Sequence, residues 1–304
     1  MAQMLLFGLA VLMMIQEPLR VEVALVTVGV RVTDRGGRAI GGLKAGDFVL
    51  YENGVRQEIA FFSSEELPIS LGILLDRSDS MAASGKLQRA KDTARYLVNS
   101  SHQGTEFLYL AFDWEIPMQS AFISDPGLVE TEIENTRMGG GTRLYDAIIE
   151  GLRMCRNARH PRQALVIITD GADQHSSRSL NDMIREVQES QAQIYAIGYF
   201  GPDEDRLFRS AEDHVTRIDG REIDNPRVVF QRLATESGAE AFFPRSDPEL
   251  RKAIEWISTD LRQQYTLSFY PPKGAGPGEY RRIQVKVKHP GARVRARPGY
   301  ALGK

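Results

Sequence analysis

The sequence predicts an α/β fold with a doubly wound, mainly parallel sheet, inserted into a small β-sandwich-like domain. Between residues 68 and 261, apolar runs of strand length alternate with segments whose apolar residues recur at helical spacing. Strands that alternate with helices form parallel sheets that are covered on both faces. Before and after this region, apolar residues recur at every second position, which is typical of antiparallel strands.

The composition is that of a soluble globular protein, with 42% hydrophobic and 26% charged residues. The net charge is only −2, so the charge balance does not suggest a nucleic-acid partner. Residues 281–304 are basic and contain no acid. We interpret these basic residues as the solvated faces of strands. The alternative is a patch that binds anions or lipids, so membrane association is not excluded. The single cysteine, Cys155, excludes an intrachain disulfide, and nothing favours a particular oligomeric state.

The amino terminus carries an apolar run over residues 4–15. This run is too short to span a membrane and has the length of a signal-peptide core. We therefore assign residues 1–18 as a signal peptide and expect export to the periplasm, the cell surface or the medium. A basic start and a clear cleavage site are missing, so a buried strand or a mis-assigned start codon are the alternatives.

Two β segments flank the predicted α/β region, at residues 19–64 and 264–300. The first alternates over residues 21–32 and then predicts strands at 48–51 and 55–62 around the Asn53-Gly54 turn. The second predicts strands at 265–270, 283–287 and 294–296. Neither segment has enough strands for a stable sheet, but together they suffice for a sandwich. We therefore predict one β domain interrupted by residues 67–262.

The elements of residues 67–262 follow in order. A further alternating run at 116–122 lies too close to the preceding strand for a helical crossover, so it predicts an antiparallel edge strand. Asp125 is placed to cap a helix that begins at Pro126. The parallel strands are expected at residues 69–75, 107–112, 164–168, 194–198 and 241–243, and the helices at 87–98, 144–149, 180–187, 228–234 and 250–261.

Polar residues follow the first of these strands. Asp76, Ser78 and Ser80 stand at alternate positions of a loop at the carboxyl end of a buried strand, where open α/β sheets bind ligands. One carboxylate and two hydroxyls are hard oxygen ligands with little charge, which suit Mg²⁺ or Mn²⁺ better than zinc. The alternative for this loop alone is that the three side chains cap the next helix.

Two later stretches complete the pattern. Thr142 follows three glycines and precedes a helix, and Asp170 ends the strand at residues 164–168. Together with the Asp-x-Ser-x-Ser loop, they resemble the metal-ion-dependent adhesion site of von Willebrand factor A domains. The resemblance implies a Rossmann-like fold over residues 67–262 and a divalent ion, Mg²⁺ or else Mn²⁺ or Ca²⁺. Its ligands would be Asp76, Ser78, Ser80, Thr142 and Asp170.

The β flanks carry a second resemblance. The stretches around Asp34, Asp47 and Asn53, and the terminal run that ends at Tyr300, look like the von Willebrand factor A-related family common in acidobacteria. This resemblance covers nearly the whole chain and implies architecture more than activity. Two residues depart from the adhesion-site pattern: Asp79 stands where a small residue is expected, and Arg77 is larger than usual. An inward Asp79 would favour Ca²⁺ and reduce the attraction for an acidic ligand.

The resemblance implies a non-enzymatic module of the cell envelope, in which the metal binds a carboxylate of a partner protein. The alternatives are a metal-dependent, phosphatase-like hydrolase that uses Asp76, and a structural envelope protein with a vestigial site. The five histidines are scattered and no catalytic elbow is present. The glycines at 139–141 are also compatible with a phosphate cradle, although no Gly-Lys-Ser/Thr follows. Asp146, Asp173 and the loop residue His175 are expected to support the site or lie at the surface.

Overall fold

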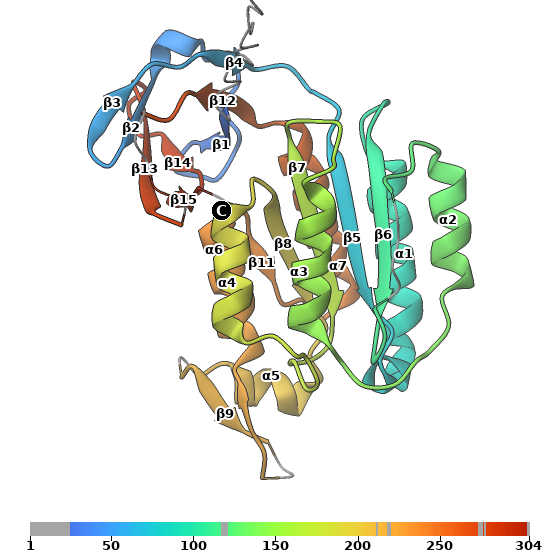
Figure 1. Cartoon of the computed structure of the whole chain (residues 1–304). Helices are drawn as coiled ribbons and strands as arrows, with labels where there is room; N and C mark the ends of the chain where they lie inside the picture. The colour runs from blue at the N-terminus through green and yellow to red at the C-terminus, as the bar shows by residue number, and fades with distance from the viewer. Residues whose placement is uncertain are drawn as a thin grey trace, which may run out of the picture.

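A computed structural model describes residues 25–116, 121–210, 212–217, 220–272, 276 and 278–302. The proposed signal peptide lies outside these residues. At the centre is a five-stranded sheet in the order β11-β8-β7-β5-β6, in which every neighbouring pair is parallel (Figure 1). Its strands are β5 (Ser70–Asp76), β6 (Glu106–Phe112), β7 (Gln163–Thr169), β8 (Gln193–Gly198) and β11 (Ala241–Phe242).

Helices cover both faces of this sheet, as the alternation of patterns predicts. Alternate residues of β5 point to opposite faces, so Ile73 joins one apolar core and Leu74 the other. One face is covered by α1 (Lys86–Asn99), α2 (Pro126–Asn135) and α7 (Asp247–Arg262), and the other by α3 (Leu144–Cys155), α4 (Leu180–Glu189) and α6 (Pro226–Ser237). Asp125 caps α2 as predicted, since its carboxylate accepts a hydrogen bond from Gly127 N at 2.9 Å.

The predicted antiparallel edge strand falls partly on residues 117–120, which lie outside the described part. Among the residues that are described, Phe107 and Ile123 form an antiparallel bridge with two reciprocal hydrogen bonds of 2.7 Å. Two other elements differ from the prediction. Helix α5 (Pro202–Phe208) and the hairpin of β9 (His214–Thr216) and β10 (Glu222–Asp224) lie between β8 and α6, where the sequence analysis placed no element.

The flanking β segments pair with one another in two antiparallel sheets. One has the order β14-β1-β12-β4 and the other β15-β13-β2-β3. Residues of both sheets, such as Val28 and Leu50, share one apolar core, so the sheets form a sandwich. The strands are β1 (Val26–Thr33), β2 (Phe48–Glu52), β3 (Val55–Gln57), β4 (Phe61–Ser63), β12 (Tyr265–Phe269), β13 (Tyr280–Val287), β14 (Arg293–Arg295) and β15 (Gly299–Ala301).

One predicted strand is divided in the sandwich. The sequence analysis placed a single strand over residues 55–62, but β3 pairs with β2 in one sheet and β4 pairs with β12 in the other. The chain changes sheets between them, as strands do where two sheets close around one core. The Asn53-Gly54 turn is as predicted, with both residues at positive φ (47° and 81°). We propose that residues 19–64 and 264–300 are one β domain that residues 67–262 interrupt.

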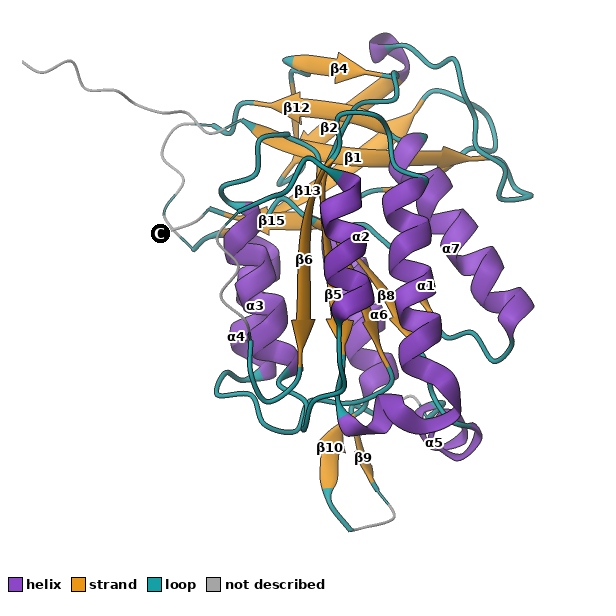
Figure 2. Ribbon diagram, turned by 90° about the vertical axis from the view of Figure 1, so that its right-hand side faces the viewer, coloured by secondary structure: helices purple, strands orange, loops and turns teal. Residues whose placement is uncertain are grey.

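A buried ionic network joins the sandwich to the α/β region. Asp260 of α7 is 0% exposed and accepts hydrogen bonds from Arg31 of β1 at 3.0 Å and from Arg295 of β14. Tyr195 of β8 and Gln264 donate to the same carboxylate, at 2.7 and 3.0 Å. Figure 2 shows the sandwich at the amino ends of the parallel strands and the β9–β10 hairpin at their carboxyl ends. No helix in the described part of the chain is long and apolar enough to cross a membrane.

Candidate metal centre

Asp76 is the last residue of β5 and is 0% exposed. Its Oδ1 accepts a hydrogen bond from Ser78 N at 2.8 Å, and its Oδ2 accepts one from the Thr169 hydroxyl at 2.6 Å. Burial raises the pKa of Asp76 to about 6, against the lowering effect of the Ser78 and Thr169 hydrogen bonds, and the charge of Asp170 adds to the increase. A carboxyl in such a place favours a cation beside it, because a cation compensates for the lost hydration of the ionised form.

The two serines connect Asp76 to Asp170. Ser78 Oγ lies 3.2 Å from Ser80 Oγ, and Ser80 Oγ donates to Asp170 Oδ1 at 2.7 Å. Strands β5 and β7 are direct neighbours in the sheet and run parallel. The residues that follow their carboxyl ends therefore lie close together. Ser80 is exposed, whereas Asp170 is 1% exposed, so the cluster is reached from the side of the serine loop.

Thr142 reaches the same edge through the glycine loop. Gly140 O accepts a hydrogen bond from Asp79 N at 2.9 Å, and Gly139 N donates to Arg77 O at 2.7 Å, so the two loops run side by side. Thr142 is 1% exposed, and its backbone carbonyl accepts hydrogen bonds from Gln174 N at 3.1 Å and from His175 N at 3.0 Å. These bonds tie the glycine loop to the loop that follows β7.

A comparison with sequence families identifies the α/β region that carries these loops. The family model described as the von Willebrand factor type A domain matches residues 71–249, a stretch that includes all five predicted ligands. The chain belongs to the von Willebrand factor type A domain family. Members of this family bind a divalent metal at the adhesion site and typically serve adhesion or protein binding. A search of curated proteins found no match.

Several solved structures are similar to this chain at low sequence identity. A minor pilin of Streptococcus sanguinis, PilB in its D319A mutant form, is 12% identical with a TM-score of 0.50, and the match covers 66% of this chain and 63% of the pilin. A von Willebrand factor type A protein from Catenulispora acidiphila is 12% identical with a TM-score of 0.49, over 91% of this chain and 74% of that one. Proximal thread matrix protein 1 from the mussel byssus, with a zinc-occupied MIDAS motif, is 16% identical with a TM-score of 0.49, over 68% and 48%.

The donor set of this A domain fits a hard divalent ion. It offers two carboxylates and three hydroxyls, which are oxygen ligands suited to Mg²⁺, Mn²⁺ or Ca²⁺. The described residues contain no group of three or more His, Cys, Asp or Glu that could hold a metal. When bound, the ion would supply an electropositive point with open coordination positions, and the protein residues would hold it and orient it.

The two residues that depart from the A-domain pattern, Arg77 and Asp79, contact other residues around the site. Arg77 forms an ion pair with Asp113, with Nη2 lying 3.1 Å from Oδ1. Its long side chain therefore reaches a carboxylate beside the glycine loop. Asp79 is exposed, and its backbone N–H is the group that contacts Gly140. Asp173 accepts from Tyr145 N at 3.2 Å, and Asp146 accepts from Ser177 N at 2.8 Å. The last two acids therefore hold the loop after β7 against α3.

The three glycines serve close packing, which accounts for them without a phosphate cradle. A Cβ on Gly139 would lie 1.6 Å from Asp113 Oδ2, and one on Gly140 would lie 1.5 Å from Trp114 Nε1. Gly140 N already donates to Asp113 Oδ2 at 3.0 Å. Trp114 is 51% exposed and packs against His175, with ring centroids 4.1 Å apart and the ring planes tilted by 43°, so this pair borders the site on the glycine side.

We expect Gly139→Ala to lower the free energy of unfolding by about 1–3 kcal/mol, because the new methyl group overlaps the Asp113 carboxylate. The measurement is urea unfolding of the metal-free protein. Gly171→Ala is the matched control, since a Cβ at Gly171 would have nothing within 4 Å. Equal losses in the two variants would contradict the packing role of Gly139.

The sequence analysis missed Lys86, the first residue of α1. Its Nζ donates to Asp170 Oδ2 at 2.6 Å, and its side chain is 13% exposed. This places an ammonium directly on a predicted metal ligand. The only available signal was a lysine six positions after Ser80 at a helix start, which by itself says nothing about a contact with Asp170.

Proposed function

We propose that this chain is a divalent-metal-dependent protein-binding module of the cell envelope, which captures an acidic group of a partner at the metal. The observation that carries the proposal is the connected cluster of Asp76, Ser78, Ser80 and Asp170, with Thr142 on the adjoining loop. We assign these five residues as the ligands of one ion, Mg²⁺ before Mn²⁺ or Ca²⁺. Export, from the apolar residues 4–15, belongs to the same proposal.

The chemistry of the cluster supports an acidic partner group. Three of the five proposed ligands are neutral hydroxyls, so the protein supplies only two negative charges, which balance a divalent ion without exceeding its charge. Mg²⁺ retains waters at such a site, and a carboxylate from a partner can take the place of one of them. The outward opening at Ser80, which is exposed, gives the partner access to the ion.

The hydrolase alternative is less well supported by the same geometry. A nucleophilic carboxylate needs an oxygen that faces the substrate. Both oxygens of Asp76 accept hydrogen bonds from the protein, and the residue is 0% exposed. A phosphatase assay with added Mg²⁺ distinguishes the two functions, because the binding module is expected to give no turnover.

We expect partner capture to depend on the metal. The immobilised chain should retain its partner from envelope extract in Mg²⁺ and release it in EDTA, because the partner carboxylate binds through the ion. Asp170→Ala serves as the matched control and should retain nothing above background in either buffer. A protein that is retained equally in Mg²⁺ and EDTA, or equally by Asp170→Ala, would contradict metal-dependent capture.

A further inference from the structure

Lys86 makes a contact that the proposed metal site does not explain. Its ammonium binds Asp170 Oδ2 at 2.6 Å, while the other oxygen, Oδ1, accepts the Ser80 hydroxyl at 2.7 Å. Asp170 is 1% exposed and the Lys86 side chain 13%, so the pair is largely shielded from water. Both oxygens of a proposed metal ligand are therefore engaged, one of them by a cation of the protein itself.

The place of Lys86 in α1 is unfavourable for a cation. It is the first residue of the helix and follows Gly85, which adopts a left-handed conformation with φ of 67°. The amino end of a helix carries a partial positive charge, so a lysine in the first turn is repelled by it. The compensation is the ion pair with Asp170, 84 residues further along the chain. A residue that contradicts the local helix preference in this way is expected to have a role at the site.

We propose, on the basis of the metal site proposed above, that Lys86 is a built-in competitor of the divalent ion for Asp170. In the metal-free protein its ammonium neutralises a carboxylate that is otherwise buried and charged. A divalent ion beside Asp170 repels the ammonium, so metal binding displaces Lys86. The ion pair between Lys86 and Asp170 stabilises the metal-free form. Because this ion pair must be broken when the metal binds, it lowers the affinity for the metal.

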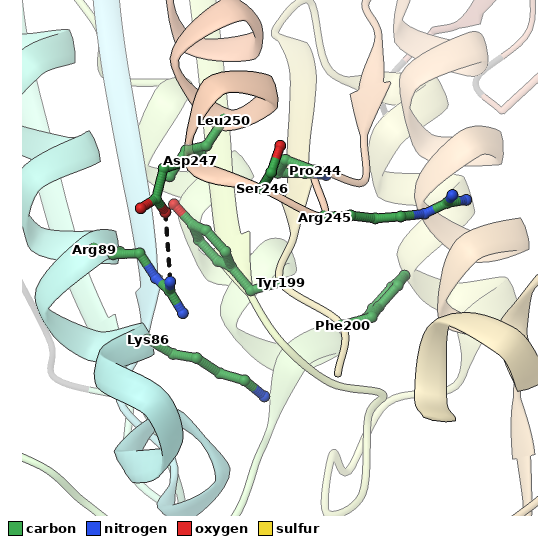
Figure 3. A pocket seen from close by; sticks show the side chains of 9 residues that line it. All are labelled: Lys86, Arg89, Tyr199, Phe200, Pro244, Arg245, Ser246, Asp247 and Leu250. Carbon is green, nitrogen blue, oxygen red and sulfur yellow. Dashed lines mark hydrogen bonds and ion pairs between the residues drawn. The ribbon is translucent and has the colours of Figure 1, made fainter. Parts of the chain in front are cut away.

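A pocket beside Lys86 leaves room for the displaced ammonium. The pocket has a volume of about 90 Å³ and lies between α1 and the start of α7 (Figure 3). Lys86 lies along one side of it, and Arg89 pairs with Asp247 across it at 3.5 Å. Arg89 is one turn after Lys86 in α1, and it forms an ion pair with Asp247 of α7.

The competition also affects the partner. With Lys86 nearby, two carboxylates, one divalent ion and one ammonium sum to a single positive charge. Without Lys86 the same site is neutral. Lys86 therefore weakens the hold on the metal and, at the same time, keeps the occupied site attractive to an acidic group.

The test is the affinity of the full chain for Mn²⁺, measured from the electron paramagnetic resonance signal of the free ion. Lys86→Met should bind Mn²⁺ roughly tenfold more tightly than wild type, because an opposing charge in contact has been removed. The same variant should melt at a lower temperature without metal and show a larger rise on adding metal. A merely structural role would lower the melting temperature equally in both conditions.

Two further variants separate the possible results. Arg89→Met removes a neighbouring charge without touching Asp170 and should change the affinity less than the Lys86 variant; an equal increase would overturn the proposal. Asp170→Ala should not bind. Equal affinity of wild type and Lys86→Met, with binding lost in Asp170→Ala, overturns the role of Lys86 and leaves the metal site intact. Absence of binding in every protein overturns both.

A labelling experiment on the wild type covers the case in which Lys86→Met fails to fold. Acylation of lysines by an N-hydroxysuccinimide ester, followed by mass spectrometry, reports how free each ammonium is. Lys86 should react faster in saturating Mg²⁺ than in EDTA, while Lys91, whose Nζ donates to Glu134 O at 2.7 Å, should keep its rate. An unchanged rate at Lys86 overturns the proposal.

Discussion

Asp260→Ala is expected to lower the free energy of unfolding by about 3–5 kcal/mol, the cost of removing one partner of a buried ion pair. The carboxylate is 0% exposed, and the side chains of Arg31 and Arg295 are 7% and 24% exposed. Alanine would leave both guanidinium groups without their acid and the Tyr195 hydroxyl without its acceptor. The loss should be large because none of these groups is free to move into water without opening the contact between α7 and the sandwich.

The measurement is urea unfolding of the full chain, with Asp203→Ala as the control. Asp203 also pairs with an arginine, Arg206, but the two side chains are 81% and 82% exposed. An exposed pair contributes only about 0–1 kcal/mol, so this variant should remain close to wild type. Asp260→Asn preserves the shape of the side chain and should still be clearly destabilised. A loss below about 1 kcal/mol for Asp260→Ala would contradict a supporting role of the network.

The second large effect concerns the metal. A ligand that binds only the folded state stabilises it by about 2.7 kcal/mol at a hundredfold excess over its dissociation constant. For a domain of this size we expect a rise in melting temperature of roughly 5–10 °C on adding Mg²⁺. Asp76→Ala and Asp170→Ala should abolish the rise, because each removes one of the two carboxylates. Ser78→Ala should reduce it less, since water can replace a neutral ligand.

The rise must be taken within each variant, as the difference between Mg²⁺ and EDTA. Asp170→Ala also leaves the Lys86 ammonium without its acid, so its metal-free melting temperature is expected to change for a separate reason. Comparing differences removes that contribution. Rises of equal size in wild type and Asp170→Ala would mean that the stabilising ion sits elsewhere.

Much of the fold could be predicted because its signal is local. Runs such as residues 69–75 and 164–168 are almost wholly apolar, as is typical of strands buried on both faces, and they form β5 and β7. The pairing of the two flanks was also predictable, since neither had enough strands to bury a face alone. By contrast, β9 and β10 have three residues each and are largely exposed, so they have almost no apolar alternation to detect.

The sequence patterns did not predict contacts between residues that lie far apart in the chain. The bond between Lys86 and Asp170 spans 84 residues, and that between Arg31 and Asp260 spans 229. No spacing rule connects such pairs. The glycine loop shows the same limit: three glycines fit both a phosphate site and close packing, and the close approach of Asp113 and Trp114 is visible only in the folded chain.

The most direct test of the account is diffraction from crystals soaked in Mn²⁺, with an anomalous difference map calculated at the manganese edge. We predict one strong peak at the carboxyl ends of β5 and β7, within bonding distance of the hydroxyls of Ser78, Ser80 and Thr142. The Lys86 ammonium should then have left Asp170. A peak elsewhere, or none at this edge of the sheet while the ion is bound in solution, would contradict the assignment of the five ligands.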